Sequence, residues 1–305
     1  MNKEALFYEE KNGLINCYLC PHYCKGLSEG KLGICGVRKA LKDSNGRIRL
    51  YSINYGEITS MSMDPIEKKP LYEFHPGSQI LSIGSFGCNF KCSFCQNYSI
   101  SQYKAESKFV PPEEMAAISL EVENNIGLAF TYNEPSIWYE YVLDVAKEIK
   151  KRNKEHKVVL VTNGYINEEP LRNLLPYVDA LNIDLKGGAE YYKKLCFGEI
   201  DHVKETIKIA YEMGKHIEVT TLLVPNENTD DETIMDIGQF LGKLNPDIPL
   251  HLSRYFPRYK MQSAVTPLDE IKKSFNILRK YLHHIYLGNL TNSEYEYCIS
   301  DQKMN

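Results

Sequence analysis

Short apolar runs rich in β-branched residues alternate with longer amphipathic segments from Gly77 onward. The short runs are typical of buried parallel strands, and the longer segments are typical of helices that cover a sheet. The predicted strands are Ile80–Phe86, Gly127–Thr131, Val158–Thr162, Ala180–Leu185, Ile217–Val224 and Leu250–Tyr255, with a short seventh at Ile285–Gly288. The predicted helices are Pro111–Asn124, Ser136–Arg152, Glu168–Leu175, Asp201–Met213, Asp230–Leu244 and Leu268–Leu282.

Six strand–helix units of this kind predict an α/β fold with parallel strands inside and helices outside. We expect a partial, TIM-like (β/α)6 barrel, because a complete TIM barrel needs eight units. A doubly wound open sheet is the alternative fold, but the first strand-to-helix turn lacks Gly-x-Gly-x-x-Gly, which argues against a dinucleotide site. A polar cluster follows each predicted strand, and the carboxyl ends of barrel strands share one mouth, so we expect the chemistry there.

The chain divides by composition into three parts. Residues 1–75 are rich in cysteine, glycine and turn-forming residues, and we expect a small metal-binding segment there. Residues 76–290 carry the predicted barrel, and residues 291–305 form a C-terminal tail.

Composition and charge narrow the function classes. The 305 residues are 43% hydrophobic and 25% charged, as in a typical globular protein. A net charge of −4 gives no reason to expect a nucleic-acid partner, and no apolar run approaches the length of a membrane span. The charged stretch Met1–Gly13 does not resemble a signal peptide, so we expect a cytoplasmic protein. Its nine cysteines, most of them in clusters, point to metal binding and not to disulfides.

Cys88, Cys92 and Cys95 are three cysteines within eight residues, directly after the first predicted strand. Three thiolates fit a 4Fe–4S cluster in which one iron has no protein ligand, whereas ordinary electron-transfer clusters take four cysteines. An open coordination position is typical of a catalytic metal site. The alternative is a zinc site completed by a distant histidine or cysteine.

This Cys-x3-Cys-x2-Cys spacing resembles that of the radical S-adenosylmethionine (SAM) enzymes. In that superfamily the open iron binds the amino group and carboxylate of SAM, and one electron splits SAM to give a 5′-deoxyadenosyl radical. The resemblance implies that Phe94, just before the third cysteine, lies beside the adenine.

Glu134 closes the second predicted strand, where many radical SAM enzymes have Gly-Gly-Glu. The acid of that motif binds the SAM amino group, which implies the same role for Glu134 with Asn133 beside it. A carboxylate facing an ammonium makes a strong, charge-assisted hydrogen bond. The alternative is that Glu134 only begins a helix before Pro135, at the positive end of the helix dipole.

Asp184 and Lys186 end the fourth predicted strand and share one face, so we expect both to point into the barrel. Opposite charges there need each other or a ligand, and a purely structural salt bridge is the alternative. Asp-Leu-Lys resembles the glycyl-radical-enzyme activases, which implies a catalytic place for both beside SAM and substrate. Asn163, in Thr-Asn-Gly, resembles the same enzymes and is expected at the cofactor, but Val161 replaces the acid of their cation site.

Four further side chains are candidates on the later units of the barrel. Glu218 would be a second inward acid that could bind the SAM ribose, or else an exposed residue at the strand start. His251 could bond SAM or substrate, or could be a satisfied core residue. Arg254 could hold a substrate anion. Cys196 could reach the mouth as a reactive thiol, or could be buried and inert.

A second cysteine set lies near the N-terminus, with the spacing of a metal-binding knuckle. Zinc and a second iron–sulfur cluster are both open as its metal, His22 is a spare ligand, and unmetallated thiols are the alternative. The set consists of Cys17, Cys20, Cys24 and Cys35.

Several motifs together resemble the AmmeMemoRadiSam-system radical SAM proteins, relatives of the pyruvate formate-lyase activating enzymes. They are Cys-Tyr-Leu-Cys-Pro-His-Tyr-Cys, Gly-Ile-Cys-Gly-Val-Arg, Asp-Pro-Ile-Glu-Lys-Lys-Pro-Leu from Asp64, Phe-His-Pro-Gly-Ser from Phe74, the cluster loop, Phe-Thr-Tyr-Asn-Glu-Pro and His-Leu-Ser-Arg-Tyr-Phe-Pro. The resemblance implies a SAM-cleaving oxidoreductase that abstracts hydrogen from a small molecule or a protein. It also implies an electron donor such as flavodoxin or ferredoxin, and pathway partners of the AMMECR and Memo types.

Three other functions remain open on the sequence alone. A glycyl-radical-enzyme activase would act on a glycine of a partner protein. A non-catalytic scaffold or redox module would use the metals for structure or sensing. A zinc hydrolase on an α/β barrel is disfavoured by the lack of a histidine-rich ligand set.

Overall fold

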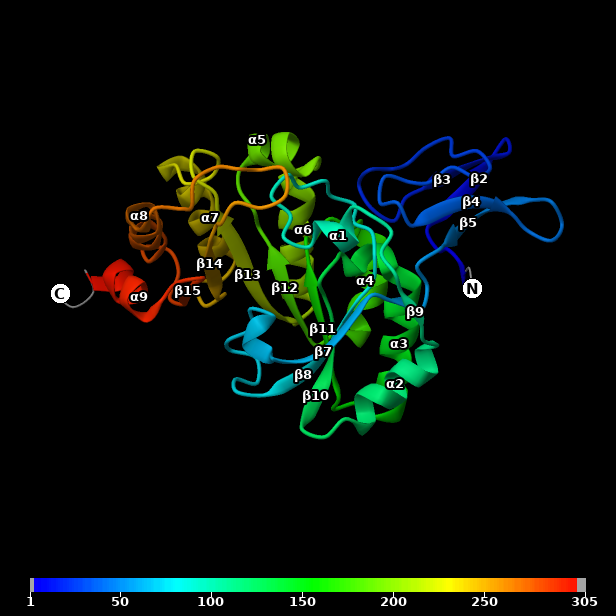
Figure 1. The fold of residues 1–305 in the computed structure, drawn as a ribbon, viewed down its shortest axis with the longest axis horizontal. Coiled ribbons are helices and arrows are strands. Elements are labelled where there is room, and N and C mark those ends of the chain that lie inside the picture. Colours follow the sequence, from blue (N-terminus) through cyan, green and yellow to red (C-terminus); the bar gives the residue numbers. More distant parts are fainter. Residues whose placement is uncertain (1–2, 301–305) are drawn as a thin grey trace.

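The computed structural model describes residues 3–300, and its core is an eight-stranded sheet (Figure 1). Seven strands run parallel and the edge strand β7 is antiparallel to β8, so the α/β partial-barrel fold is confirmed. In sheet order the strands are β15 (Ile285–Gly288), β14 (Leu250–Arg254), β13 (His216–Leu223), β12 (Ala180–Asp184), β11 (Lys157–Thr162), β10 (Asn125–Phe130), β8 (Gln79–Gly84) and β7 (Ser60–Pro65).

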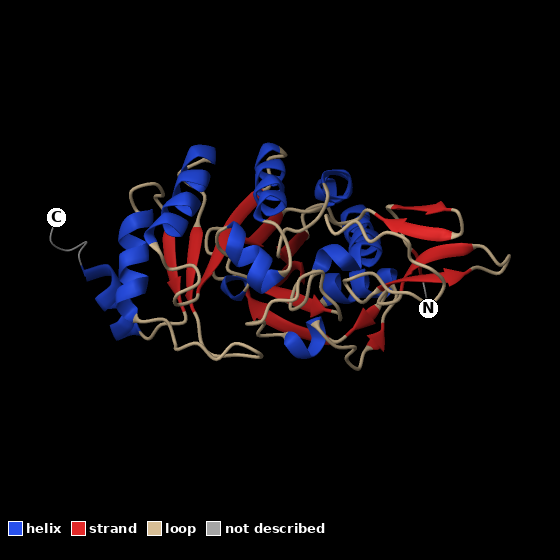
Figure 2. Ribbon diagram, turned by 90° about the horizontal axis from the view of Figure 1, so that it is seen from above, coloured by secondary structure: helices blue, strands red, loops and turns tan. Residues whose placement is uncertain are grey.

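Helices follow the parallel strands and cover the outer face of the sheet (Figure 2). Their starts follow local chemistry: Glu113 and Glu114 lie in the first turn of α2, and the Asp230 side chain caps α7. The longer helices are α2 (Pro112–Glu121), α3 (Tyr139–Arg152), α4 (Glu168–Leu174), α6 (Ile200–Glu212), α7 (Asp231–Leu244), α8 (Leu268–Leu278) and α9 (Asn292–Ile299). Shorter turns are α1 (Tyr98–Ser101), α5 (Ala189–Tyr191), a π turn at Tyr192–Cys196, and 3-10 turns at Ile66–Lys68, Pro135–Trp138 and Leu175–Tyr177.

Three helix predictions differ from the structure. The helix predicted from Ser136 begins as a 3-10 turn and becomes α-helical only at Tyr139. The helix predicted to reach Leu282 ends at Leu278, because the backbone N–H groups of Lys280 and Tyr281 bond three residues back and tighten the chain. The predicted tail, residues 291–305, contains α9, and residues 301–305 lie outside the described chain. No helix among the described residues is long and apolar enough to cross a membrane.

The N-terminal residues form a small lobe at one end of the molecule, opposite α9 (Figure 1). β7 follows this lobe but belongs to the main sheet, so the predicted division at residue 75 is too late. The lobe strands are β1 (Lys3–Glu4), β2 (Tyr8–Lys11), β3 (Leu14–Cys17), β4 (Arg38–Lys42) and β5 (Ile48–Ser52), while β6 (Glu57–Ile58) pairs with β9 (Lys108–Phe109).

The segment between β7 and β8 fills the barrel at the amino-terminal ends of its strands. Ile66 and Leu71 pack there against the inward side chains near the strand starts, and all of them are fully buried. The side-chain amide of Asn182 donates to Pro70 O at 2.8 Å and holds the same segment. The strand residues of this apolar layer are Ile80, Ala129, Val159 and Ala180.

Candidate active site

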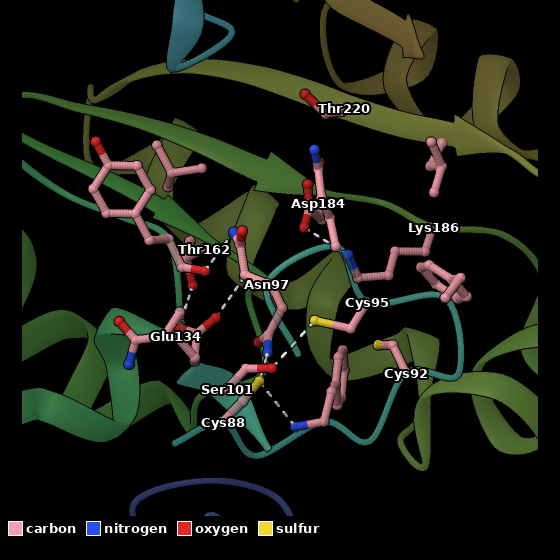
Figure 3. Close-up of a pocket in the computed structure, with 18 of the residues that line it drawn as sticks. Cys88, Cys92, Cys95, Asn97, Ser101, Glu134, Thr162, Asp184, Lys186 and Thr220 are labelled. Carbon is pink, nitrogen blue, oxygen red and sulfur yellow. Dashed lines mark hydrogen bonds and ion pairs between the residues drawn. The ribbon is translucent and has the colours of Figure 1, made fainter. Parts of the chain in front are cut away.

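A cavity of about 310 Å³ opens at the carboxyl ends of the parallel strands, above the apolar layer. Figure 3 shows that its side chains come from the cysteine loop and from the ends of successive strands. Nine of the predicted site residues line this cavity: Cys88, Cys92, Phe94, Cys95, Asn133, Glu134, Asn163, Asp184 and Lys186.

Hydrogen-bond donors surround the sulfurs of the cysteine loop. The backbone N–H of Phe90 lies 3.3 Å from Cys88 Sγ, and the Asn163 amide lies 3.7 Å from the same sulfur. Cys95 Sγ is 3.2 Å from Ser101 Oγ (Figure 3). Such contacts stabilise negative charge on sulfur and tune a metal bound to it.

The π turn at Tyr192–Cys196 supports the cysteine loop from behind. Its carbonyls at Leu195 and Cys196 accept hydrogen bonds from Ser93 N and Lys91 N, at 3.2 and 3.0 Å. The Cys196 thiol is fully buried and does not line the cavity, which agrees with the alternative of a buried cysteine and not with a reactive thiol at the mouth. Instead it hydrogen-bonds Cys92, and this contact together with burial raises the pKa of the Cys92 thiol.

Asp184 and Lys186 form an ion pair of 2.6 Å on the cavity wall, with the lysine largely buried (Figure 3). Burial is the largest single effect and lowers the pKa of Lys186, but the Asp184 carboxylate and the nearby sulfurs of Cys92 and Cys196 together raise it above its ordinary value. Both side chains face the cavity, as predicted, and they also form the salt bridge with each other that was the alternative prediction. The pair therefore places a fixed cation and an accepting carboxylate side by side at the mouth.

Glu134 is buried, and its carboxylate is enclosed by protein donors. Oε1 accepts from Thr162 Oγ1 at 2.6 Å and from Ser136 N at 2.9 Å, and Oε2 accepts from Asn163 N at 2.8 Å. Burial raises the pKa of Glu134, and these hydrogen bonds oppose that shift. Asn133 bonds Ser85 N and Gly87 O, so it ties the end of β10 to the start of the cysteine loop.

The structure does not support cofactor contact by Glu218 or His251, because neither lines the cavity. Glu218 is completely buried near the start of β13 and accepts hydrogen bonds from His216, His251 and the backbone N–H groups of Tyr72 and Glu73. Both residues lie on the inward face of the barrel, but each is two residues closer to the start of its strand than the residue that lines the cavity. Thr220 and Ser253, two residues further along the same strands, reach the cavity instead.

Arg254 is also occupied elsewhere. Its guanidinium pairs with Glu294 at 2.8 Å and donates to Thr266 O at 2.9 Å, and it does not line the cavity. The prediction that it holds a substrate anion is therefore not supported by the geometry.

Tyr132 also lines the cavity, although it is not among the predicted site residues. Its backbone is left-handed, with φ of 69°, a conformation that costs a residue other than glycine about 1–2 kcal/mol. Its hydroxyl donates to Asp64 Oδ2 at 2.8 Å, and the buried Lys69 pairs with the same oxygen at 2.8 Å. The other lining residues that were not predicted are Phe90, Gln96, Asn97, Ser101, Thr131, Val161, Thr162, Thr220, Leu222, Ser253 and Asn289.

The donor set of this cavity fits an iron–sulfur cluster better than a single ion. Among the described residues, no three His, Cys, Asp or Glu side chains are placed around one ion position. A 4Fe–4S cluster binds each cysteine at a different iron, so its ligands do not converge on one point. Three soft thiols from one loop, facing a cavity, are compatible with that arrangement.

The fold and the site define an α/β partial barrel with a cysteine loop at the mouth. Comparison with models of protein families gives the same class. Residues 82–237 match the model of the radical SAM superfamily, and the chain belongs to that superfamily. Members of the superfamily use a 4Fe–4S cluster and SAM.

Individual proteins and solved structures are similar to this chain in sequence or in fold. The chain is 38% identical to the uncharacterized protein MJ0808 of Methanocaldococcus jannaschii, over 97% of this chain and 88% of that one. It is 22% identical to the pyruvate formate-lyase-activating enzyme of Staphylococcus epidermidis, over 52% and 67% of the two chains. The crystal structure of Streptococcus suis SuiB bound to S-adenosylmethionine has the same fold, with a TM-score of 0.54 and 14% identity over 71% of this chain and 55% of that one.

Proposed function

We propose that this protein is a radical SAM enzyme of the AmmeMemoRadiSam system, which cleaves SAM reductively and abstracts hydrogen from a substrate. The observation that carries the proposal is that Cys88, Cys92 and Cys95 face one cavity together with the Asp184–Lys186 pair. The motifs of the cysteine-rich segment and the segment from Asp64 support the narrower assignment.

The three cysteines would hold the 4Fe–4S cluster at its three protein-bound irons. When bound, the cluster supplies one electron to the sulfonium of SAM, which releases methionine and a 5′-deoxyadenosyl radical. Phe94 would pack on the adenine, and the Asp184–Lys186 pair would orient SAM and substrate at the mouth. Glu134 would fix the backbone of Asn163, because its carboxylate already accepts three protein hydrogen bonds.

Anaerobic assay for 5′-deoxyadenosine tests the proposal. The purified protein would be reduced chemically and supplied with SAM, and Cys92→Ala should lose the cluster absorption and product formation. Cys298→Ala is a matched control, because Cys298 is also buried but lies on α9. Full SAM cleavage by Cys92→Ala would refute the proposal. An intact cluster without cleavage, even after cell extract is added as a source of substrate, would favour a non-catalytic scaffold.

An activase for a glycyl-radical enzyme is the second candidate, favoured by the similarity to a pyruvate formate-lyase-activating enzyme. The substrate would then be a backbone glycine of a partner protein, and not a small molecule. A persistent glycyl-radical signal in electron paramagnetic resonance, after incubation with such a partner, would establish this candidate. Flavodoxin or ferredoxin is the proposed electron donor, and proteins of the AMMECR and Memo types are the proposed pathway partners.

A further inference from the structure

We propose that Cys17, Cys20, Cys24 and Cys35 hold a second, thiolate-bound metal centre that supports the cysteine loop of the active site. The four residues come from three separate segments: the end of β3, the turn after it, and the turn before β4. The segments are joined by backbone hydrogen bonds from Cys17 N to Cys24 O at 2.8 Å and from Gly33 N to Arg38 O at 2.8 Å.

All four cysteines line one small cavity of about 10 Å³, the size of a single water-sized sphere. Three of them are buried and Cys24 is half-buried, so a metal there would be closed to solvent, as in structural sites. No three of these side chains are already placed around a single ion position in the described chain. Binding would therefore draw the four sulfurs together by rotation of the cysteine side chains.

The sulfurs are surrounded by donors, which is the environment that thiolates need. Ile34 N lies 3.4 Å from Cys24 Sγ, and Arg38 Nη1 lies 3.9 Å from Cys17 Sγ. A neutral thiol is a weak hydrogen-bond acceptor, so these N–H donors stabilise it little. A metal-bound thiolate is negatively charged, so each donor makes a stronger, charge-assisted hydrogen bond to it.

Arg38 supplies positive charge beside the cavity. Its guanidinium is buried and pairs with Glu140 of α3, while Arg38 Nε and Glu140 Oε2 have no hydrogen-bond partner among residues 3–300. A divalent ion with four thiolates carries a net charge of −2, and an iron–sulfur cluster with four thiolates is also anionic. A buried guanidinium directly beside the sulfurs offsets such a charge and gives its own buried charge a second partner.

The side chain of His22, which the sequence suggests as a further metal ligand, contacts the backbone of the active-site loop. Its Nε2 lies 2.8 Å from Asn89 O, in the cysteine loop of the active site. A Cβ added at Gly87 would lie 2.5 Å from Val37 Cγ1 and 2.9 Å from Cys35 O. The four-cysteine site is therefore in direct packing contact with residues 87–89, and metal binding would make the base of that loop more rigid.

Metal analysis of a variant that lacks the active-site cysteines tests this proposal independently of the proposed function. Cys88→Ala, Cys92→Ala and Cys95→Ala would be combined, and the purified protein analysed for zinc, iron and sulfide without oxygen. Retention of about one zinc, or of an iron–sulfur cluster, supports the site and identifies its metal. Adding Cys20→Ser should then remove the metal, while adding Cys298→Ser should not.

Cobalt substitution covers the case in which Cys20→Ser does not fold. The triple variant, stripped of metal, would be titrated with Co²⁺ and followed for the sulfur-to-cobalt charge-transfer band of a tetrahedral thiolate site. Hydrogen exchange at residues 87–89 should slow when the site is filled. The proposal is wrong if the triple variant holds no metal as purified and binds neither Co²⁺, zinc nor reconstituted iron and sulfide.

Discussion

Arg38 and Glu140 form a buried ion pair that joins the N-terminal lobe to α3, with side-chain exposures of 2% and 1%. Glu140→Gln would leave the guanidinium buried without its carboxylate partner, and we expect the free energy of unfolding of the metal-free protein to fall by about 3–5 kcal/mol. Chemical denaturation measures this change. Lys3→Met is the matched control, because Lys3 pairs with Asp144 of the same helix at 3.2 Å but is half-exposed, so its loss should cost less than about 1 kcal/mol. Equal losses in the two variants would contradict this account.

Gly87→Ala should destabilise the protein by more than backbone strain alone. Gly87 has φ of +90°, and its added Cβ would overlap Val37, whereas Gly46 has φ of +75° with no atom within 4 Å of the added Cβ. Gly46→Ala therefore measures the strain, about 1–2 kcal/mol, and the excess loss in Gly87→Ala measures the packing between lobe and loop. Thermal unfolding and iron content would be compared for both variants, and identical results would show that the contact is unimportant.

The Asn163 amide should raise the reduction potential of a cluster bound at Cys88. It donates toward Cys88 Sγ at 3.7 Å, and donors to a ligand sulfur stabilise the more negative, reduced state. Asn163→Ala should therefore shift the midpoint potential to a more negative value, as measured by redox titration without oxygen. Asn167→Ala is a suitable control, since Asn167 donates instead to Tyr18 O at 2.6 Å. An unchanged or more positive potential in Asn163→Ala would contradict the prediction.

Glu218 should make stability depend on acid pH. Burial alone would raise its pKa, but hydrogen bonds from His216 and His251 dominate and lower the pKa of Glu218 to about 2. A carboxyl whose pKa is depressed stabilises the fold above its unfolded pKa of about 4.3, and this contribution, about 3 kcal/mol, is lost as pH falls toward 2. The free energy of unfolding of the native protein should therefore fall more steeply between pH 4.3 and 2 than that of Glu218→Gln.

Denaturant titrations across that pH range measure the difference for Glu218→Gln. Glu190→Gln is the control, because the Glu190 side chain is 89% exposed. Parallel pH profiles for the native protein and Glu218→Gln would show that Glu218 is not the group responsible.

The strands could be predicted because both faces of the sheet are buried, so each strand is a continuous apolar run ending in a polar cluster. Depth along a strand could not be predicted, which is why Glu218 was expected at the cofactor while Thr220 reaches the cavity. Period-two alternation predicts which face of the sheet a side chain lies on. It does not predict how far along the strands the segment between β7 and β8, here called the plug, fills the barrel. The plug itself, with Ile66 and Leu71, depends on contacts with residues far away in the sequence.

The edge strand β7 (Ser60–Pro65) is absent from the predicted strands for a related reason. β7 pairs antiparallel with β8, and its sequence, Ser-Met-Ser-Met-Asp-Pro, lacks the β-branched residues that marked the other strands. Arg254 was assigned to substrate because an arginine at a strand end suits anions, but its partner Glu294 lies in a helix that was not predicted.

The plug formed by Ile66 and Leu71 has a consequence for the order of events during turnover. The amino-terminal end of the barrel is filled, and Glu218 holds the backbone of Tyr72 and Glu73 there. Ligands must therefore enter and leave at the other end, where the cysteine loop lies. A molecule that settles deepest must enter first and leave last. We therefore expect ordered binding at a single entrance, in which the deeper of two bound ligands is the first to arrive and the last to leave.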